Sequence, residues 1–258
     1  RNLLVIHKVN IMRKKLNIRT SAYFALFVCV ITIFGCSTKK VTREQIEWSR
    51  FRWEQESATD KPRILFIGNS ISVGYFPIVS AQLNETANCD HYATSRSVED
   101  PAFFKETKMA MGKYNHQIIH FNNGLHGWHL NDKQYEEGLR KYVRFLMKKK
   151  ANNCQLVFSL STPYPSKEEN IKLNEEMNPV VLERNRIAMK VMSDYDIPVI
   201  DLYVLVEPKL EKYSIRKGDL HYKKEGYELM AGKISSKILE LMGIESKSLT
   251  EAEIDQGW

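Results

Sequence analysis

The sequence predicts an α/β fold with a parallel sheet of five strands and helices on both faces. Short runs rich in β-branched and aromatic residues alternate with segments of helical periodicity, which is typical of right-handed crossover units. No repeat, low-complexity tract or linker interrupts the series, so residues 62–242 are expected to form one domain. The composition, with 43% hydrophobic and 27% charged residues among 258, is that of a globular protein.

The five predicted strands are short apolar runs at 63–68, 89–94, 117–122, 155–160 and 198–202. Helices are predicted from apolar residues three or four positions apart, or from capping residues, at 73–84, at 102–111, after Asn131 and Gln134, after Asn178 and Pro179, and at 225–241.

A tether and a short helix are expected ahead of the first strand, over residues 36–61. Thr42 and Gln45 have the spacing of a capping box, which predicts the start of this helix. Its apolar side chains would pack on the domain: Ile46, Trp48, Phe51 and Trp53.

Nearly all of the net charge lies near the start of the chain. Residues 1–35 hold six Lys and Arg and no acid, so removing their charges from the total of +7 leaves +1 for the rest. The body of the protein is therefore close to neutral, and no basic stripe with interleaved aromatics remains that would follow a nucleic acid backbone. Met12 is the expected start, and a basic segment followed by the apolar run 22–34 predicts a signal peptide, since that run is shorter than a membrane span of ~20 residues.

The signal segment ends in Gly35-Cys36-Ser37, which resembles a bacterial lipobox. This resemblance implies that Cys36 is lipidated and becomes the mature N-terminus, with an uncleaved N-terminal anchor as the alternative. We therefore expect an exported protein, lipid-anchored in the bacterial cell envelope as a periplasmic or outer-membrane lipoprotein. Residues 1–35 would be an upstream extension with the signal peptide, and residues 243–258 a C-terminal tail.

Two cysteines remain in the body of the chain, Cys89 and Cys154. An exported compartment permits a disulfide between them, but two separate buried thiols are equally compatible with the sequence. No cysteine spacing typical of a metal site occurs.

Two short motifs carry the chemistry. Ser70 follows the first predicted strand, at the sheet edge where open α/β folds bind ligands, although a serine there can also simply cap the next helix. Asp219 and His221 immediately precede the last helix, as a general base with its orienting acid would, although an exposed loop histidine is the simpler interpretation of that pair alone. The fold brings both motifs to one edge, and this joint placement favours catalysis.

With these residues the chain resembles the GDSL-type, or SGNH, hydrolases, which are serine esterases with a flavodoxin-like three-layer fold. Gly68-Asn69-Ser70-Ile71 matches the first block of that family. Asp219-Leu220-His221 is one residue shorter than the common Asp-x-x-His block, but with Glu225-Gly226 it is similar to a subgroup ending in Asp-Val-His. Over residues 62–242 the resemblance implies Ser70 as nucleophile, His221 as base, Asp219 as acid and no cofactor.

The middle of the family pattern differs in this chain. In place of Gly-x-Asn-Asp, residues 120–129 resemble the Phe-Asn-x-Gly-Leu-His form of bacterial lipoprotein members. The resemblance implies an oxyanion hole made by the backbone N–H of Ser70, a loop N–H near Ser97, and a side chain of Asn122 or His126. The candidates for substrate binding are Asn69, Arg96, Trp128, Tyr164 and Tyr222.

The expected function is therefore hydrolysis of an acyl ester, most simply an acetyl ester, on a small molecule or polysaccharide. A metal-dependent hydrolase is one alternative, because His120, His126 and His129 lie close in sequence, although no acid falls within that cluster. A second alternative is a lipid-anchored glycan-binding protein that kept the fold and lost the reaction.

Overall fold

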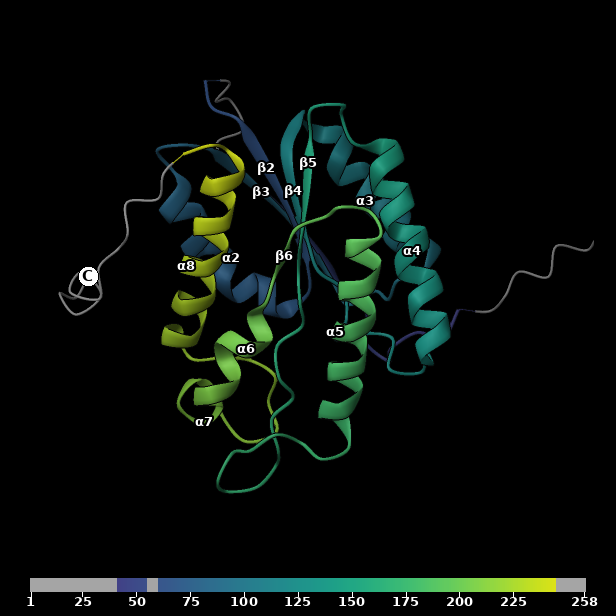
Figure 1. Cartoon of the computed structure of the whole chain (residues 1–258), viewed down its shortest axis with the longest axis vertical. Helices are drawn as coiled ribbons and strands as arrows, with labels where there is room; N and C mark the ends of the chain where they lie inside the picture. Colours follow the sequence, from purple (N-terminus) through teal and green to yellow (C-terminus); the bar gives the residue numbers. More distant parts are fainter. Residues whose placement is uncertain (1–40, 55–59, 245–258) are drawn as a thin grey trace, which may run out of the picture. The chain divides into compact units, whose positions relative to one another are not determined.

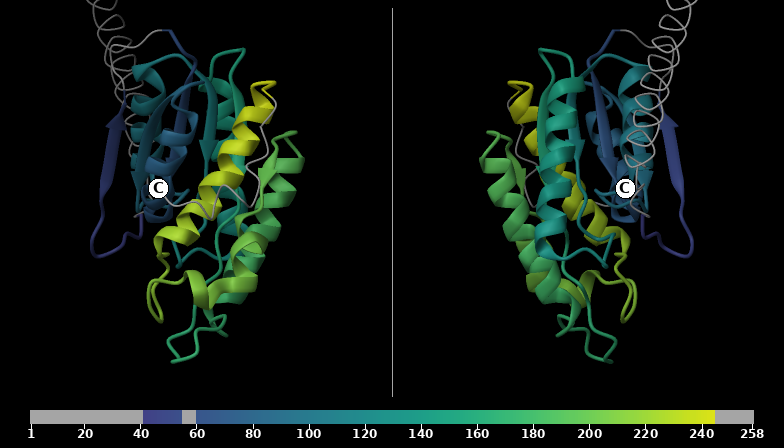
Figure 2. Two further views of the ribbon diagram at one scale, coloured as in Figure 1. Left: turned by 90° about the vertical axis from the view of Figure 1, so that its left-hand side faces the viewer. Right: turned by 90° about the vertical axis from the view of Figure 1, so that its right-hand side faces the viewer.

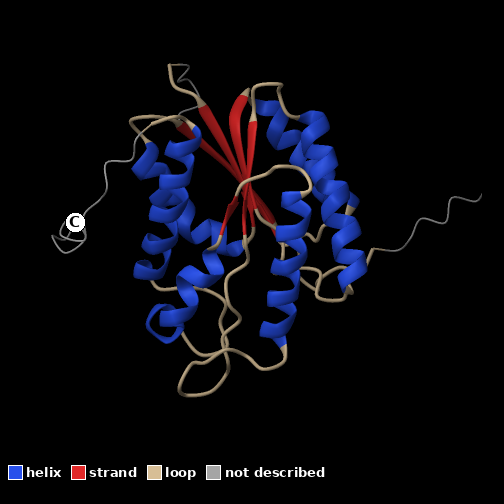
Figure 3. Ribbon diagram, viewed as in Figure 1, coloured by secondary structure: helices blue, strands red, loops and turns tan. Residues whose placement is uncertain are grey.

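The computed structural model describes residues 41–54 and 60–244, and these form one six-stranded sheet between two layers of helices (Figures 1 and 3). The strand order is β1-β3-β2-β4-β5-β6. Strands β2 to β6 run parallel, as predicted, and β1 is an additional edge strand antiparallel to β3. The predicted signal peptide, Cys36 and most of the C-terminal tail lie outside the described residues.

The strands are β1 Ser49–Trp53, β2 Arg63–Gly68, β3 Asn88–Thr94, β4 His116–Phe121, β5 Gln155–Ser159 and β6 Val199–Ile200. The helices are α2 Ser70–Leu83, α3 Pro101–Lys113, α4 Asp132–Lys149, α5 Met177–Ser193, α6 Leu202–Val206, the 3-10 turn Glu207–Lys209, α7 Leu210–Tyr213 and α8 Lys224–Leu241.

The short helix predicted ahead of the first strand is wrong, because residues Ser49–Trp53 form β1. Phe51 and Trp53 are two residues apart, which places both side chains on one face of a strand. There Phe51 stacks on Tyr92 of β3, with ring centroids 4.8 Å apart. The free edge of β3 needs a pairing partner, and this tertiary demand decided the conformation of the segment.

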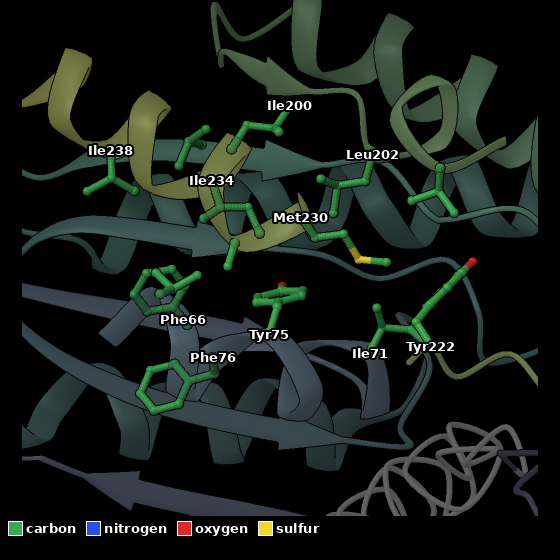
Figure 4. Close-up of a cluster of buried hydrophobic side chains, with 14 of the residues drawn as sticks. Phe66, Ile71, Tyr75, Phe76, Ile200, Leu202, Tyr222, Met230, Ile234 and Ile238 are labelled. Carbon is green, nitrogen blue, oxygen red and sulfur yellow. The ribbon is translucent and has the colours of Figure 1, made fainter. Parts of the chain in front are cut away.

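Each face of the sheet has its own hydrophobic core. Ile64 and Phe66 of β2 pack under α2, α6 and α8 (Figure 4 shows Phe66), whereas Leu65 and Ile67 pack under α3, α4 and α5. Successive residues of a strand point to opposite faces, so a central parallel strand covered on both sides is apolar throughout. Every residue of β2 is accordingly buried.

Two boundaries differ from the predicted ones for a local reason. Helix α2 begins at Ser70, three residues earlier than expected, because Asn69 serves as its N-cap. Strand β6 spans only two residues, because Asp201 accepts the N–H groups of Tyr203 and Val204 and so starts α6. The capping box predicted from Asn131 and Gln134 is confirmed at the start of α4.

Cys89 and Cys154 are both buried and unpaired. Of the two alternatives that the sequence left open, a disulfide or two separate buried thiols, the structure has the second. Over residues 41–54 and 60–244, no helix has the length and apolar character needed to cross a membrane.

A buried ionic network joins three central strands near their amino ends. Two guanidinium nitrogens of Arg63 on β2 donate to the two carboxylate oxygens of Asp90 on β3, each over 2.9 Å. His116 on β4 lies 3.1 Å from the same carboxylate. Burial alone would raise the pKa of Asp90, but the bonds from Arg63 and His116 outweigh it and hold the pKa below its usual value.

We predict that Asp90→Ala lowers the free energy of unfolding by about 3–5 kcal/mol, because it removes the carboxylate that balances the buried Arg63 charge. Urea unfolding at pH 7 measures this loss. The matched control is Asp194→Ala, which breaks a half-exposed ion pair with Arg140 and should cost about 1 kcal/mol or less. The stability that Asp90 contributes should be present above pH ~4 and lost as the pH falls through its lowered pKa. Equal losses in the two variants would contradict the role of the network.

Candidate active site

The predicted catalytic residues lie at the carboxyl edge of the parallel sheet. Ser70 follows β2 directly, while Asp219 and His221 lie in the segment that leads into α8. Helices α2 and α8 pack against each other, and Ile71 and Tyr222, which follow Ser70 and His221, belong to one buried cluster (Figure 4). The two motifs, separated by 149 positions, thus enter the same part of the molecule.

The Ser70 side chain has no role in capping α2. Asn69 is the N-cap, and its side-chain oxygen accepts the N–H of Ile71 over 3.0 Å. The partly buried Ser70 hydroxyl has no hydrogen-bond partner in the part of the chain that the structure describes. Its backbone N–H is among the first N–H groups of the helix, which have no acceptor within the helix and suit an anion.

The shorter spacing of Asp219 and His221 still brings their side chains together. The Asp219 carboxylate lies 2.6 Å from Nδ1 of His221 and also accepts that residue's backbone N–H, and Arg216 donates to its other oxygen over 2.8 Å. Burial alone would raise the pKa of Asp219, but these hydrogen bonds hold it below its usual value. With Nδ1 facing the carboxylate, Nε2 is the nitrogen left for a substrate or nucleophile.

No hydrogen bond joins Ser70 to His221 among the described residues. Catalytic hydrogen bonds are often long or poorly aligned before substrate binds, so a working pair does not require this bond in the free protein. The segment that carries His221 is fixed beside the loop after β5 (Figure 2), where the Gly218 N–H donates to the Ser166 carbonyl over 2.7 Å. The Tyr222 hydroxyl also donates to the Pro163 carbonyl, over 3.3 Å.

A small cavity lies beside the nucleophile turn. It is lined by residues from the ends of β2, β4, β5 and β6, namely Asn69, Ile71, Tyr75, Asn122, Leu125, Leu160, Ser161, Thr162 and Leu202. The side-chain nitrogen of Asn69 is buried and has no acceptor within the described ranges, which keeps Asn69 as a candidate for binding substrate.

Both side chains considered for the oxyanion hole have other partners. The Asn122 amide donates to the Ser159 carbonyl over 2.8 Å and so joins β4 to β5. His126 turns its Nδ1 toward Glu44, at 2.7 Å. Ser97 is buried against the loop after β4, since a Cβ on Gly127 would lie 2.5 Å from the Ser97 Cβ.

Two of the substrate-binding candidates have surroundings that make them less suited to that role. Arg96 is held by ion pairs to Glu47, Asp100 and Glu106 at 2.9–3.0 Å, so its charge is already matched. Tyr222 is only 3% exposed, which leaves its ring little free surface for a sugar.

The other two aromatic candidates remain predictions. Trp128 and Tyr164 are half-buried and meet edge to face, with ring centroids 5.8 Å apart. Each keeps some exposed ring surface, which sugar-binding aromatics require.

The three clustered histidines do not converge. His120 is buried and bonds to the Ser159 hydroxyl over 2.6 Å, while His126 and His129 bond separately to Glu44 and Glu99. Among the residues that the structure describes, no group of three or more His, Cys, Asp or Glu side chains has the arrangement of a metal site.

Sequence reasoning missed one functional candidate near the site. Arg184 of α5 reaches the loop after β4 and bonds to three of its carbonyl groups. In the sequence Arg184 falls on the apolar side of α5. Charged residues are rarely buried without a partner, so a charge on that side indicates a specific role.

Two neutral histidines lie beneath the site. His91 bonds through Nε2 to the Ser72 hydroxyl over 2.8 Å, and His120 bonds in the same way to the Ser159 hydroxyl. Burial lowers the pKa of each ring to about 3.

We predict that both rings stay neutral down to pH 5, as NMR spectra of the imidazole nitrogens would report. The unfolded chain binds protons at these positions below pH ~6.5, so stability should fall as the pH drops, by about 1.4 kcal/mol per pH unit for each ring. Urea unfolding at pH 7 and pH 5 measures the fall. In the His120→Gln variant, position 120 cannot titrate. The loss of stability between pH 7 and pH 5 should therefore be smaller than in wild type by the contribution of one ring. Protonation of either ring in the folded protein above pH 5 would contradict this interpretation.

Comparison with solved structures finds the same arrangement of sheet and helices in several hydrolases. The acetyl xylan esterase AlAXEase aligns with a TM-score of 0.55 and 14% identity, over 68% of this chain and 99% of that one. The acetylxylan esterase Axe2 from Geobacillus stearothermophilus aligns with a TM-score of 0.55 and 14% identity, over 71% and 95%. A member of the lipolytic G-D-S-L family from Veillonella parvula aligns with a TM-score of 0.53 and 20% identity, over 66% and 94%.

No protein-family model matches the sequence, and comparison with curated proteins finds no significant match. The identities to the solved structures are low, so these likenesses bear on the fold. The chain has the three-layer α/β fold of the GDSL-type, or SGNH, hydrolases.

Proposed function

We propose that the protein is a serine esterase that cleaves an acyl ester, most simply an acetyl ester, on a carbohydrate. The observation that carries this proposal is the 2.6 Å contact between the Asp219 carboxylate and Nδ1 of His221, at the sheet edge where Ser70 begins α2. Because Asn69 caps the helix, the hydroxyl of Ser70 is left for chemistry. The esterases among the structural neighbours support the same reaction class.

The mechanism follows from these residue types. Ser70 Oγ attacks the ester carbonyl while Nε2 of His221 takes its proton, and Asp219 holds the ring tautomer and stabilises the imidazolium. The tetrahedral intermediate collapses as the protonated His221 gives its proton to the leaving alcohol. Water then attacks the acyl-enzyme with His221 again as base, which releases the acid and restores Ser70.

The developing negative charge on the carbonyl oxygen needs fixed donors. The Ser70 N–H and a loop N–H near Ser97 are two of them, and the loop after β4 supplies the third. Removing one such donor typically costs ~2.7–4 kcal/mol of transition-state stabilisation. No step of this mechanism uses a cofactor.

We propose a sugar as the alcohol part of the substrate, because of the aromatic pair Trp128 and Tyr164. Half-exposed rings beside a polar loop suit the apolar face of a sugar. A catalytically impaired glycan-binding protein would use the same surface, and it differs only in lacking turnover.

We predict that Ser70→Ala and His221→Ala each lower kcat/KM for p-nitrophenyl acetate and for acetylated xylooligosaccharides by about 10³-fold or more. The matched control is Ser80→Ala, on the same helix, where the serine bonds to Glu54 away from the catalytic edge. The control should keep wild-type turnover. Equal activity in Ser70→Ala and wild type would rule out the serine mechanism, and sugar binding without turnover in wild type would favour the glycan-binding alternative.

We also propose that Cys36 carries the lipid anchor, on the basis of the Gly35-Cys36-Ser37 junction. We expect Cys36→Ser to abolish processing and lipid attachment and to move the protein out of the membrane fraction. Mass spectrometry of the membrane-extracted protein measures this. An unmodified Cys36 that still follows residues 12–35 would contradict the lipoprotein assignment.

A further inference from the structure

Arg184 is a buried cation that forms hydrogen bonds with the loop after β4. Its side chain is among the largest that are fully buried, with 1% exposure. One terminal nitrogen donates to the carbonyls of Gly124 and His126 over 2.9 and 3.0 Å, and the other donates to that of Gly127 over 2.7 Å. The guanidinium also lies over the rings of Trp128 and Tyr135, 4.9 and 5.1 Å from their centroids.

This charge has an unusual set of partners. Within the described residues no carboxylate lies within ion-pairing distance of Arg184, so carbonyl oxygens and ring faces replace its water, and the Asp132 carboxylate acts on the charge only from farther away. Burial lowers the pKa of the guanidinium, although it stays charged at physiological pH. A well-packed apolar side chain is often as stabilising as a buried charge, so stability alone does not account for an arginine here.

The three hydrogen bonds fix the direction of three peptide groups. In a planar trans peptide the C=O and the following N–H point in opposite directions. The N–H groups of Leu125, Gly127 and Trp128 therefore point away from the guanidinium. None of them has an acceptor in the described part of the chain. Gly127 has φ +69°, and a left-handed residue within such a turn lets successive N–H groups converge on an anion.

The loop after β4 lies beside the nucleophile turn and also contacts Ser97. Leu125 lines the small cavity together with Asn69 and Ile71, which flank Ser70. Gly127 and Trp128 line a second cavity together with Ser97. The loop whose carbonyl groups Arg184 binds therefore lines both the cavity beside the nucleophile turn and the cavity beside Ser97.

We propose that Arg184 is a positioning residue that turns the backbone N–H groups of the β4–α4 loop toward the oxyanion. This inference rests on the proposed esterase function and deepens it, because it assigns oxyanion donors to the loop backbone in addition to the Asn122 amide, which keeps one N–H beyond its bond to Ser159. The positive charge also polarises the three peptide groups, which makes their N–H groups stronger donors.

The test compares Arg184→Met and Arg184→Lys with wild type. Methionine keeps similar bulk without charge, and lysine keeps the charge but cannot bond three carbonyls in one plane. We expect kcat to fall about 10²-fold in both variants while KM changes less than about threefold, because oxyanion donors act in the transition state. The inhibition constant of phenylboronic acid, which forms a tetrahedral adduct with a serine, should rise by the same factor as kcat/KM falls.

Two further measurements separate positioning from structural support. Guanidinium ion added to an Arg184→Gly variant should restore part of kcat. The matched control is Arg140→Met on α4, whose ion pairs with Glu136 and Asp194 lie on the surface, and it should keep wild-type kinetics and boronate affinity. If the Arg184 variants fail to fold, Gly127→Ala tests the same loop with Arg184 in place, since a Cβ there forces a shift against Ser97, and it should also lower kcat about 10²-fold.

Wild-type kcat in a folded Arg184→Met variant would overturn the inference. So would wild-type kcat in Gly127→Ala, or a loss of kcat without a matching loss of boronate affinity. A failure of the proposed esterase function gives a different result. In that case the wild-type protein hydrolyses no ester, or Ser70→Ala remains as active as wild type. Either result would overturn the proposed function together with the role of Arg184.

Discussion

The parallel direction of β2 to β6 is the constraint on which the rest of the structure depends. Because these strands run the same way, each of them ends at one edge, and the loops that follow must meet there. The order β3-β2-β4-β5 puts the Ser70 turn between the loops that carry Ser97 and Asn122. Helix α8 then packs on α2 and brings His221 to the same edge from the far end of the chain.

Buried polar pairs hold this edge from below. Ser72 with His91 and Ser159 with His120 look like catalytic Ser–His pairs, but all four side chains are 2% exposed or less, and burial keeps both rings neutral. Each pair satisfies a serine hydroxyl and one ring nitrogen inside a layer that is otherwise apolar, whereas Nδ1 of His120 has no partner among the described residues. Such satisfied contacts make a layer rigid, and the loops above it can then keep a fixed geometry.

The sequence was sufficient for the parts of the structure that local pattern controls. The apolar run before Gly68, the capping box at Asn131 and the position of Ser70 after its strand follow from periodicity and turn chemistry. Strand β1 did not, because the need of β3 for an edge partner is a tertiary effect. The short spacing of Asp219 and His221 was likewise undecidable without coordinates, since their contact depends on the turn that Arg216 and Gly218 help to form.

Side-chain roles at the loops were the hardest to predict. Arg96 and Tyr222 have the residue types of a substrate site, but one is neutralised by three acids and the other is buried in the core under α2 and α8. Arg184 shows the reverse case, a charge hidden in an apolar helix face whose three carbonyl partners lie some 60 positions earlier in the chain. Partners so distant in sequence leave no local pattern.

The central claim is that Ser70 is the nucleophile at this edge, and covalent labelling tests it most directly. A fluorophosphonate reacts with a serine that an adjacent base activates, and peptide mass spectrometry then locates the adduct. We expect a single adduct on Ser70 of the folded protein and none after heat denaturation. Labelling of another residue instead, or no labelling of the folded protein at all, would contradict the catalytic site described above.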